Sequence, residues 1–205
     1  MNTLSQNSTT DSDMTRDDIL KQNPKNPAPH DVLDLLDIFK VEYYGFDGMI
    51  HAGQIVLNKN VIEDVKTFFK TALVIKFPIQ KIIPISSEAY KWDDETSCND
   101  NNSSGYNFRY IMGTNRMSKH AHGLAFDINP VQNIYVRYDE HMKEIYRCPQ
   151  EAIYKKDAVG TLTHDHPLVI LMKNLGWIWG GDWTPESGRV DYQHFEKKCV
   201  MAMDI

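Results

Sequence analysis

The chain has 205 residues, of which 41% are hydrophobic and 24% are charged, a composition typical of a globular protein with one domain. Its 28 acidic residues outnumber its 22 basic ones, and the formal net charge of −6 leaves no surplus of cations to neutralise a nucleic-acid backbone. The longest apolar run, residues 167–172, is far shorter than the roughly 20 residues of a membrane-spanning helix. We therefore expect neither a nucleic-acid partner nor a membrane span.

The first 28 residues are predicted to be a disordered polar tail. They are rich in Ser, Thr, Asn and Asp, and residues 23–27, Asn-Pro-Lys-Asn-Pro, are typical of a linker. They show neither the basic start nor the apolar stretch of a secretory signal. The predicted division is a tail, residues 1–28, followed by one globular domain, residues 29–205.

A helix and a hairpin are predicted at the start of this domain. Apolar residues recur at helical spacing behind Asp31. The residues that carry this spacing are Val32, Leu35, Leu36 and Phe39. Residues 41–44 and 54–57 have the composition of strands, and the turn at residues 45–48 would join them into a hairpin.

A second helix is predicted behind Asn60, which would be its N-cap. Its buried face would comprise Val61, Val65, Phe68, Phe69, Ala72 and Leu73. Residues 81–85 form a short apolar strand, and Pro84 indicates that this strand lies at an edge or ends early. Residues 97–105, Ser-Cys-Asn-Asp-Asn-Asn-Ser-Ser-Gly, are polar and rich in turn formers and predict a long loop.

The remaining elements complete an α+β pattern. Residues 124–128 predict a strand that Asn129-Pro130 ends, a third helix runs from His166-Pro167 to Gly176, and residues 192–196 predict the last strand. Helices and strands interleave without βαβ regularity or a repeat. We expect an α+β fold, a small single domain with a central antiparallel sheet flanked by helices.

Two segments combine residue types that bind metals. Residues 118–127 place imidazoles before a Gly turn and a carboxylate, Asp127, after it, and Asp191 precedes His194 by three residues. Two imidazoles and one carboxylate form a three-ligand set of the kind that catalytic zinc uses, with a fourth position open to water. Asp191 would then be the general base.

The residues alone leave two points open. His120 and His122 form a His-x-His pair, so either could be the ligand. Residues three apart face opposite sides of a regular strand, so Asp191 and His194 can share a site only if the chain turns or bulges between them.

A family resemblance rests on two motifs, Ser118-x-His120-x-x-Gly123-x-Ala125-x-Asp127 and Asp191-x-x-His194-Phe195-Glu196. Together they resemble the D-alanyl-D-alanine carboxypeptidase and L-alanyl-D-glutamate endopeptidase family of zinc peptidases, which includes VanY-like enzymes and acts on peptidoglycan. The resemblance extends over about residues 41–196, and it implies the fold of the wider lysostaphin, D-Ala-D-Ala peptidase and hedgehog superfamily.

The resemblance implies one zinc ion held by His120, Asp127 and His194. It favours His120 over His122 because only His120 has the family's spacing to Asp127.

The resemblance also implies three further roles. Asp191 would be the catalytic carboxylate, and an Asp where carboxypeptidase members more often have Glu favours an endopeptidase. Arg109 falls where the family has a cation that faces the scissile carbonyl, and a positive charge there would stabilise the oxyanion. Ser118 would line the same substrate-binding pocket.

Several candidate site residues could instead have purely structural roles. Asp191 could be a turn residue, and Arg109 could be half of a structural ion pair. The pair His164 and His166 suggests a second metal site, but Asp165 before Pro167 is more typical of a helix cap. The cysteines, three in number with no Cys-x-x-Cys pair, are expected to be buried thiols.

The expected function is a zinc-dependent peptidase that hydrolyses peptidoglycan stem peptides, as carboxypeptidase or endopeptidase. The alternative is a non-catalytic zinc module that binds cell-wall peptide or a protein partner, and a metal-free binder would require the motif match to be coincidental. The substrate indicates the cell envelope, periplasmic or extracellular, with a cytoplasmic location or release by lysis as the alternative. The oligomeric state is left open, with a monomer as the simpler expectation.

Overall fold

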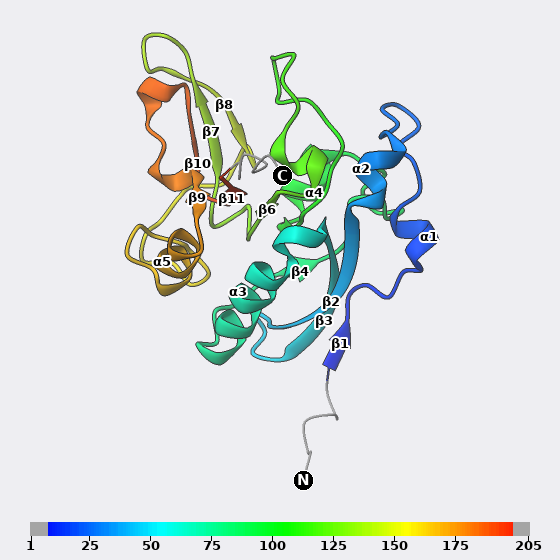
Figure 1. Ribbon diagram of the computed structural model, residues 1–205. Coiled ribbons are helices and arrows are strands. Elements are labelled where there is room, and N and C mark those ends of the chain that lie inside the picture. Colours follow the sequence, from blue (N-terminus) through cyan, green and yellow to red (C-terminus); the bar gives the residue numbers. More distant parts are fainter. Residues whose placement is uncertain (1–7, 199–205) are drawn as a thin grey trace.

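A long β-hairpin confirms the first prediction of paired strands. In the computed structural model, which describes residues 8–198, β2 (Leu36–Tyr44) pairs antiparallel with β3 (Ile50–Asn58) (Figure 1). The turn between them contains Gly48, whose φ of 80° is a conformation that glycine adopts without steric cost. Side chains alternate along β3, so that Ile55 belongs to the main core and Val56 to a smaller second core on the other face.

The remaining elements are short. The helices are α1 (Arg16–Ile19), α2 (His30–Asp34), η1 (Lys59–Val61), α3 (Ile62–Val74), α4 (Asp94–Asn99), η2 (Lys119–His122), α5 (Pro167–Asn174), η3 (Gly180–Asp182) and η4 (Pro185–Ser187). The other strands are β1 (Ser8–Thr10), β4 (Lys81–Ile82), β5 (Asn102–Ser103), β6 (Ala125–Asp127), β7 (Tyr135–Tyr138), β8 (Glu144–Cys148), β9 (Trp177–Trp179), β10 (Arg189–Asp191) and β11 (His194–Lys197). No helix within residues 8–198 is long and apolar enough to cross a membrane.

Residues 8–28 do not form the disordered tail that their composition predicts. β1 adds to β3 as a parallel strand, and Gln54 on β3 accepts hydrogen bonds from Ser12 Oγ at 2.6 Å and from the Met14 amide at 2.7 Å. Ile19 is 1% exposed in the second core. A few well-placed contacts therefore order a segment whose overall composition is polar, while residues 1–7 lie outside the described range. The boundary of the predicted catalytic domain at residue 29 stays a prediction.

The first predicted helix is shorter than its apolar spacing indicated. α2 ends at Asp34, and Leu36 and Phe39 lie on β2, where Leu36 pairs with Asn58. The long ladder with β3 supplies backbone hydrogen bonds that override the local helical period.

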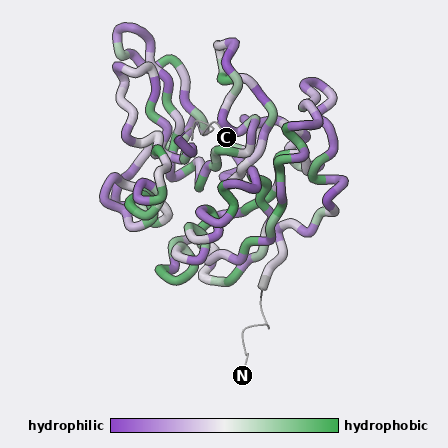
Figure 2. The backbone as a smooth tube through the Cα atoms, viewed as in Figure 1, coloured by the Kyte–Doolittle hydropathy of each residue, from purple (hydrophilic) through white to green (hydrophobic). Residues whose placement is uncertain are grey.

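The second predicted helix is confirmed as α3, which packs across the hairpin and buries most of the predicted face. Its start differs, because η1 precedes it and Asn58, not Asn60, caps that turn by accepting the Asn60 amide. Leu73 is half-buried. Figure 2 shows hydrophobic residues gathered where α3 meets the hairpin and hydrophilic residues along the outer loops.

The polar segment at residues 97–105 forms regular structure and is mostly buried, rather than being a long loop. α4 ends at Asn99, and β5 pairs in parallel with β4. The side chain of Asn102 binds the backbone of Ile83 beyond the end of β4. Its Nδ2 donates to the Ile83 carbonyl at 2.9 Å, and its Oδ1 accepts the Ile83 amide at 2.8 Å. β4 ends at Ile82, which confirms the early end that Pro84 predicted.

Two small antiparallel sheets stand in place of one central sheet. The first has the order β6-β11-β9, and the second has the order β10-β7-β8. α5 confirms the third predicted helix and ends before Gly176, but its N-cap is His166, whose Nδ1 accepts the Leu168 amide, rather than Asp165. The fold is a mixture of helices and several sheets, consistent with the predicted α+β class.

Candidate metal centre

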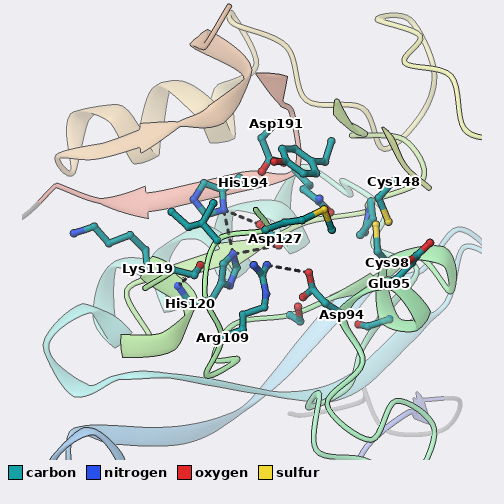
Figure 3. A pocket seen from close by; sticks show the side chains of 18 of the residues that line it. Asp94, Glu95, Cys98, Arg109, Lys119, His120, Asp127, Cys148, Asp191 and His194 are labelled. Atoms are coloured by element: carbon teal, nitrogen blue, oxygen red, sulfur yellow. Dashed lines mark hydrogen bonds and ion pairs between the residues drawn. The ribbon is translucent and has the colours of Figure 1, made fainter. Parts of the chain in front are cut away.

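Three side chains that the sequence singles out converge at one buried point. His120 Nε2 lies 3.1 Å from His194 Nδ1 and 3.2 Å from Asp127 Oδ2, and His194 Nδ1 lies 3.0 Å from Asp127 Oδ1 (Figure 3). The three residues are 3%, 7% and 9% exposed. Within residues 8–198 they are the one group of three or more His, Cys, Asp or Glu whose ligand atoms cluster closely enough to hold a metal ion.

The local backbone explains how His120 and Asp127 meet. Ser118 caps η2 by accepting the His120 amide at 3.2 Å, and Gly123 ends the turn with a φ of 64°. The chain then enters β6, which carries Asp127. A Cβ at Gly123 would lie 2.6 Å from the Asn58 amide nitrogen, so the reversal requires glycine at this position.

His194 reaches the same point through strand pairing. β11 lies antiparallel to β6 with His194 directly opposite Asp127. Residues directly opposite in an antiparallel pair have neighbouring side chains, so the register brings together two residues that are 67 positions apart.

Two further contacts fix which nitrogen of each imidazole faces the cluster. His120 Nδ1 donates its proton to the Gly105 carbonyl at 2.6 Å, and His194 Nε2 donates to Glu196 Oε2 at 3.2 Å. The opposite nitrogens of the neutral rings therefore carry lone pairs, and both point at each other and at the Asp127 carboxylate. Three acceptors that converge without a donor fit a bound cation, and the outer hydrogen bonds are of the kind that orient metal-binding histidines.

The electrostatics of the cluster lead to the same conclusion. Burial by itself lowers the pKa of His194, but hydrogen bonds to Asp127 and Glu196 raise it to about 10. Burial opposes ionisation of Asp127, yet the two imidazoles hold its pKa well below its usual range. The site therefore favours positive charge between its acceptors: a proton on His194 supplies that charge when no metal is bound, and a metal ion would take its place. Nitrogen and carboxylate ligands suit zinc.

Asp191 lies beside the cluster without being part of it. Its Oδ1 is buried and has no hydrogen-bond partner in the structure. Burial raises the pKa of Asp191 to about 7, the charge of Asp127 acts in the same direction, and the imidazoles of His194 and His120 oppose it. A half-buried carboxylate with one buried, unpartnered oxygen and a pKa near neutrality is suited to proton transfer.

Arg109 lies in the same cavity and also takes part in an ion pair. Its Nη2 lies 3.0 Å from Asp94 Oδ2, and its Nε is buried without a partner. Burial lowers its pKa, but the carboxylates of Asp94, Asp127 and Asp191 raise it above its ordinary value. The structural ion pair is thus present, and Asp94 holds the guanidinium toward the cluster (Figure 3).

The cavity has a volume of about 340 Å³, and all six candidate site residues line it. Ser118 is 5% exposed and holds η2 in place in addition to lining the cavity. Asp191 and His194 meet there because the chain turns at residues 192–193 between β10 and β11, which is the turn that the sequence required.

The other histidines lie elsewhere. His122 is exposed, which agrees with His120 as the residue that enters the cluster. His164 Nδ1 contacts Asp182 Oδ1 at 2.8 Å on the surface, while His166 caps α5. Cys98 and Cys148 are buried free thiols as predicted, and Cys199 lies outside the described residues.

Sequence reasoning missed several residues that shape the centre. Glu196 belongs to the Asp191-x-x-His194-Phe195-Glu196 motif, but the motif by itself predicts no role for it. Gly105 contributes only its carbonyl. Trp183 packs against His194 with ring centroids 5.5 Å apart. Gly180 allows Asp191 to approach, since a Cβ there would lie 2.5 Å from the Asp191 carbonyl oxygen. The alternation along β11 could have indicated Glu196, because residues i and i+2 share a face.

Comparison with known proteins bears on this part of the chain. Residues 112–197 match a family model described as D-alanyl-D-alanine carboxypeptidase. No curated protein sequence and no solved structure matches the chain significantly. The matched segment contains the three clustered residues, Ser118 and Asp191, while Arg109 lies just before it. The part of the chain that forms the candidate centre is thus similar to a family of peptidases.

Proposed function

We propose that the protein is a zinc-dependent peptidase that hydrolyses a peptide bond in bacterial peptidoglycan stem peptides. The observation that carries this proposal is the convergence of three buried acceptor residues beside the Asp191 carboxylate, whose Oδ1 is buried without a partner and which is not itself part of the cluster. A purely structural metal site has no use for such a carboxylate, whereas hydrolysis requires a proton acceptor near the attacking water.

His120, Asp127 and His194 would hold the ion through His120 Nε2, an Asp127 carboxylate oxygen and His194 Nδ1. A zinc ion bound there would supply Lewis acidity, which lowers the pKa of a water and polarises a carbonyl. Gly105 and Glu196 would keep the imidazoles in the required tautomers.

Asp191 would transfer the proton. Its free Oδ1 would accept a proton from the water that attacks the carbonyl carbon. After the C–N bond breaks, the same oxygen would return that proton to the departing amine. A pKa of about 7 suits both directions, because neither protonation state is strongly favoured near neutral pH.

Arg109 would stabilise the negative charge that develops on the carbonyl oxygen. The guanidinium lines the cavity, and Asp94 restrains it at 3.0 Å, so little reorganisation is needed when charge appears. Ser118 would contribute to substrate binding from the wall of the same cavity. We propose the cell envelope as the location of this activity, because the proposed substrate lies there.

The proposal is tested by incubating zinc-loaded protein with purified stem peptides, with and without a chelator, and determining product masses. Loss of one terminal D-Ala identifies a carboxypeptidase, and a cut between L-Ala and D-Glu identifies an endopeptidase. Chelator-sensitive cleavage supports the proposal. Absence of cleavage by protein with bound zinc contradicts it and favours the non-catalytic binding module.

A further inference from the structure

A second cavity adjoins the candidate metal centre. It has a volume of about 390 Å³ and lies between the loop at residues 109–117 and the β7-β8-β10 sheet, which stand opposite each other in Figure 1. The two cavities share wall residues, among them Tyr135, Trp183 and Arg189. They therefore form one continuous depression that extends away from the metal centre.

The charge of this second cavity contrasts with the rest of the chain. Three arginines line it, Arg116, Arg137 and Arg189, and no Asp or Glu is among its lining residues. The cavity at the metal centre, by comparison, has six acidic lining residues, and the whole chain carries a net charge of −6. Three of the six arginines of an acidic chain thus line one cavity that has no acidic lining residue.

These three arginines also differ from the others in their pairing. Arg16, Arg109 and Arg147 each form an ion pair with a carboxylate. Within residues 8–198, no carboxylate lies within ion-pair distance of Arg116, Arg137 or Arg189. The guanidinium of Arg189 instead lies 4.1 Å from the centroid of the Trp183 ring, which holds the cation against the cavity wall.

The surrounding side chains restrict where a ligand can bind. Tyr135, Tyr138 and Trp183 supply aromatic surface in the cavity, and Arg137 lies beneath the turn of the opposite loop, where a Cβ at Gly113 would be 3.2 Å from its guanidinium. Guanidinium groups bind carboxylates in a planar, bidentate manner, and aromatic walls favour ordered binding of the chain that carries the carboxylate.

Trp183 connects this cavity to the metal centre. Its ring centroid lies 5.5 Å from that of His194, and the guanidinium carbon of Arg189 lies 4.1 Å from the centroid of the Trp183 ring. Because an extended peptide advances about 3.4 Å per residue, a chain held at the metal centre would pass Arg189 within about three residues of the scissile bond.

We propose that this second cavity is a substrate subsite in which Arg116, Arg137 and Arg189 bind a free carboxylate of the stem peptide within about three residues of the scissile bond. The inference rests on the proposed peptidase function and adds a substrate class to it, peptides with a free side carboxylate near the cleaved bond. Amidation of that carboxylate removes the charge while preserving its size, so amidated peptides are poor substrates.

The test uses four synthetic stem peptides that differ in two positions. The second residue is either D-isoglutamate or its amide, D-isoglutamine, and the third is either diaminopimelate or lysine. We expect loss of one of these carboxylates to raise KM about 10- to 100-fold for the wild-type protein, with little change in kcat. In the R116Q/R137Q variant we expect the difference in KM between acidic and uncharged peptides to disappear. Without the two guanidinium groups, KM rises for the acidic peptide and not for its uncharged counterpart.

Lys143→Gln is the matched control. Lys143 is exposed in the turn between β7 and β8, outside the lining of the cavity, so its loss removes a nearby positive charge without touching the subsite. Discrimination is expected to be unchanged in this variant. Equal KM values for all four peptides with the wild-type protein, or undiminished discrimination in R116Q/R137Q, overturn the subsite.

Binding measurements separate this inference from the proposed function. Calorimetric titration of the same peptides into zinc-loaded Asp191→Asn protein, which lacks the proposed base, reports recognition without turnover. Cleavage without carboxylate discrimination rejects the subsite alone. The opposite result is that no peptide is cleaved but acidic peptides bind more tightly than uncharged ones, and the R116Q/R137Q substitutions abolish this difference. That result rejects the peptidase and retains the subsite.

Discussion

Asp191 ends β10 and His194 begins β11, so two residues three positions apart belong to different sheets and still line the same cavity. The turn at residues 192–193 changes the direction of the chain between them. The proposed metal ligand and the proposed proton acceptor are thereby placed on different sheets within a single short segment.

Asp191→Asn preserves the size of the side chain and removes its basicity. We expect kcat to fall by a factor of about 10² to 10⁴, the usual contribution of a general base, while zinc content is unchanged. Steady-state kinetics and elemental analysis of the purified variant measure both quantities. Asp182→Asn, which changes a nearby carboxylate outside the cavity lining, is the control, and normal turnover of Asp191→Asn would show that the base is assigned wrongly.

His120→Ala removes one acceptor from the cluster, and His122→Ala changes its exposed neighbour. Zinc at 100 times its dissociation constant stabilises a protein by about 2.7 kcal/mol, which corresponds to roughly 5–10 °C in Tm for a chain of this size. We expect this increase for the wild type and for His122→Ala, and a much smaller one for His120→Ala. Thermal melts with added zinc or chelator measure it, and an equal increase in all three proteins would contradict the assignment.

Glu196→Gln weakens the contact that orients His194. Because Glu196 Oε2 accepts the His194 Nε2 proton at 3.2 Å, its negative charge makes the opposite nitrogen more basic. The amide should reduce zinc affinity about 10- to 100-fold, as replacement of such outer contacts does in other zinc sites. Competition with a chromogenic chelator measures the affinity, with Glu42→Gln on the exposed face of β2 as the control. Equal affinities in the two variants would argue that Glu196 has no such role.

Gly180→Ala acts on Asp191 through the backbone. The added Cβ would lie 2.5 Å from the Asp191 carbonyl oxygen and 2.9 Å from its Cβ, so β10 must move. We expect at least about a tenfold loss in kcat, because catalysis is sensitive to displacements of about 1 Å, with zinc binding retained. Gly176→Ala distinguishes displacement from general destabilisation: its φ of 81° makes alanine strained, but no heavy atom lies within 4 Å of the added Cβ. Similar losses in both variants would indicate a stability effect only.

His166 should make stability depend on pH. Burial lowers its pKa from the ordinary 6.5, and its Nδ1 must be unprotonated to accept the Leu168 amide. The unfolded chain therefore binds this proton more readily, so the contribution is fully present above pH 6.5 and is lost as the pH falls through the lower pKa of the folded state. His166→Asn keeps an N-cap without a titrating group. Denaturant unfolding between pH 5 and 8 should show a smaller loss of stability on acidification for this variant than for the wild type, and parallel curves would contradict the role.

Several local elements and the residue types of the candidate site are readable from the amino-acid sequence. The spacing of apolar residues specified α3 and α5, the turn between two strand-like runs specified the hairpin, and His120, Asp127 and His194 were identified by residue type and motif. These features depend on interactions between residues close in sequence, where side-chain period and turn composition dominate.

Strand pairing that overrides local preference, and the contacts between distant side chains, become visible only in the folded chain. Leu36 and Phe39 lie on a strand because β2 pairs with β3 through backbone hydrogen bonds. Residues 8–28 are ordered by contacts with Gln54 and the second core. The register of β11 on β6 placed His194 opposite Asp127, and the unpaired arginines were brought together from separate segments. Such contacts join residues far apart in the chain, so their energies depend on the folded arrangement and leave no periodic signal in one sequence.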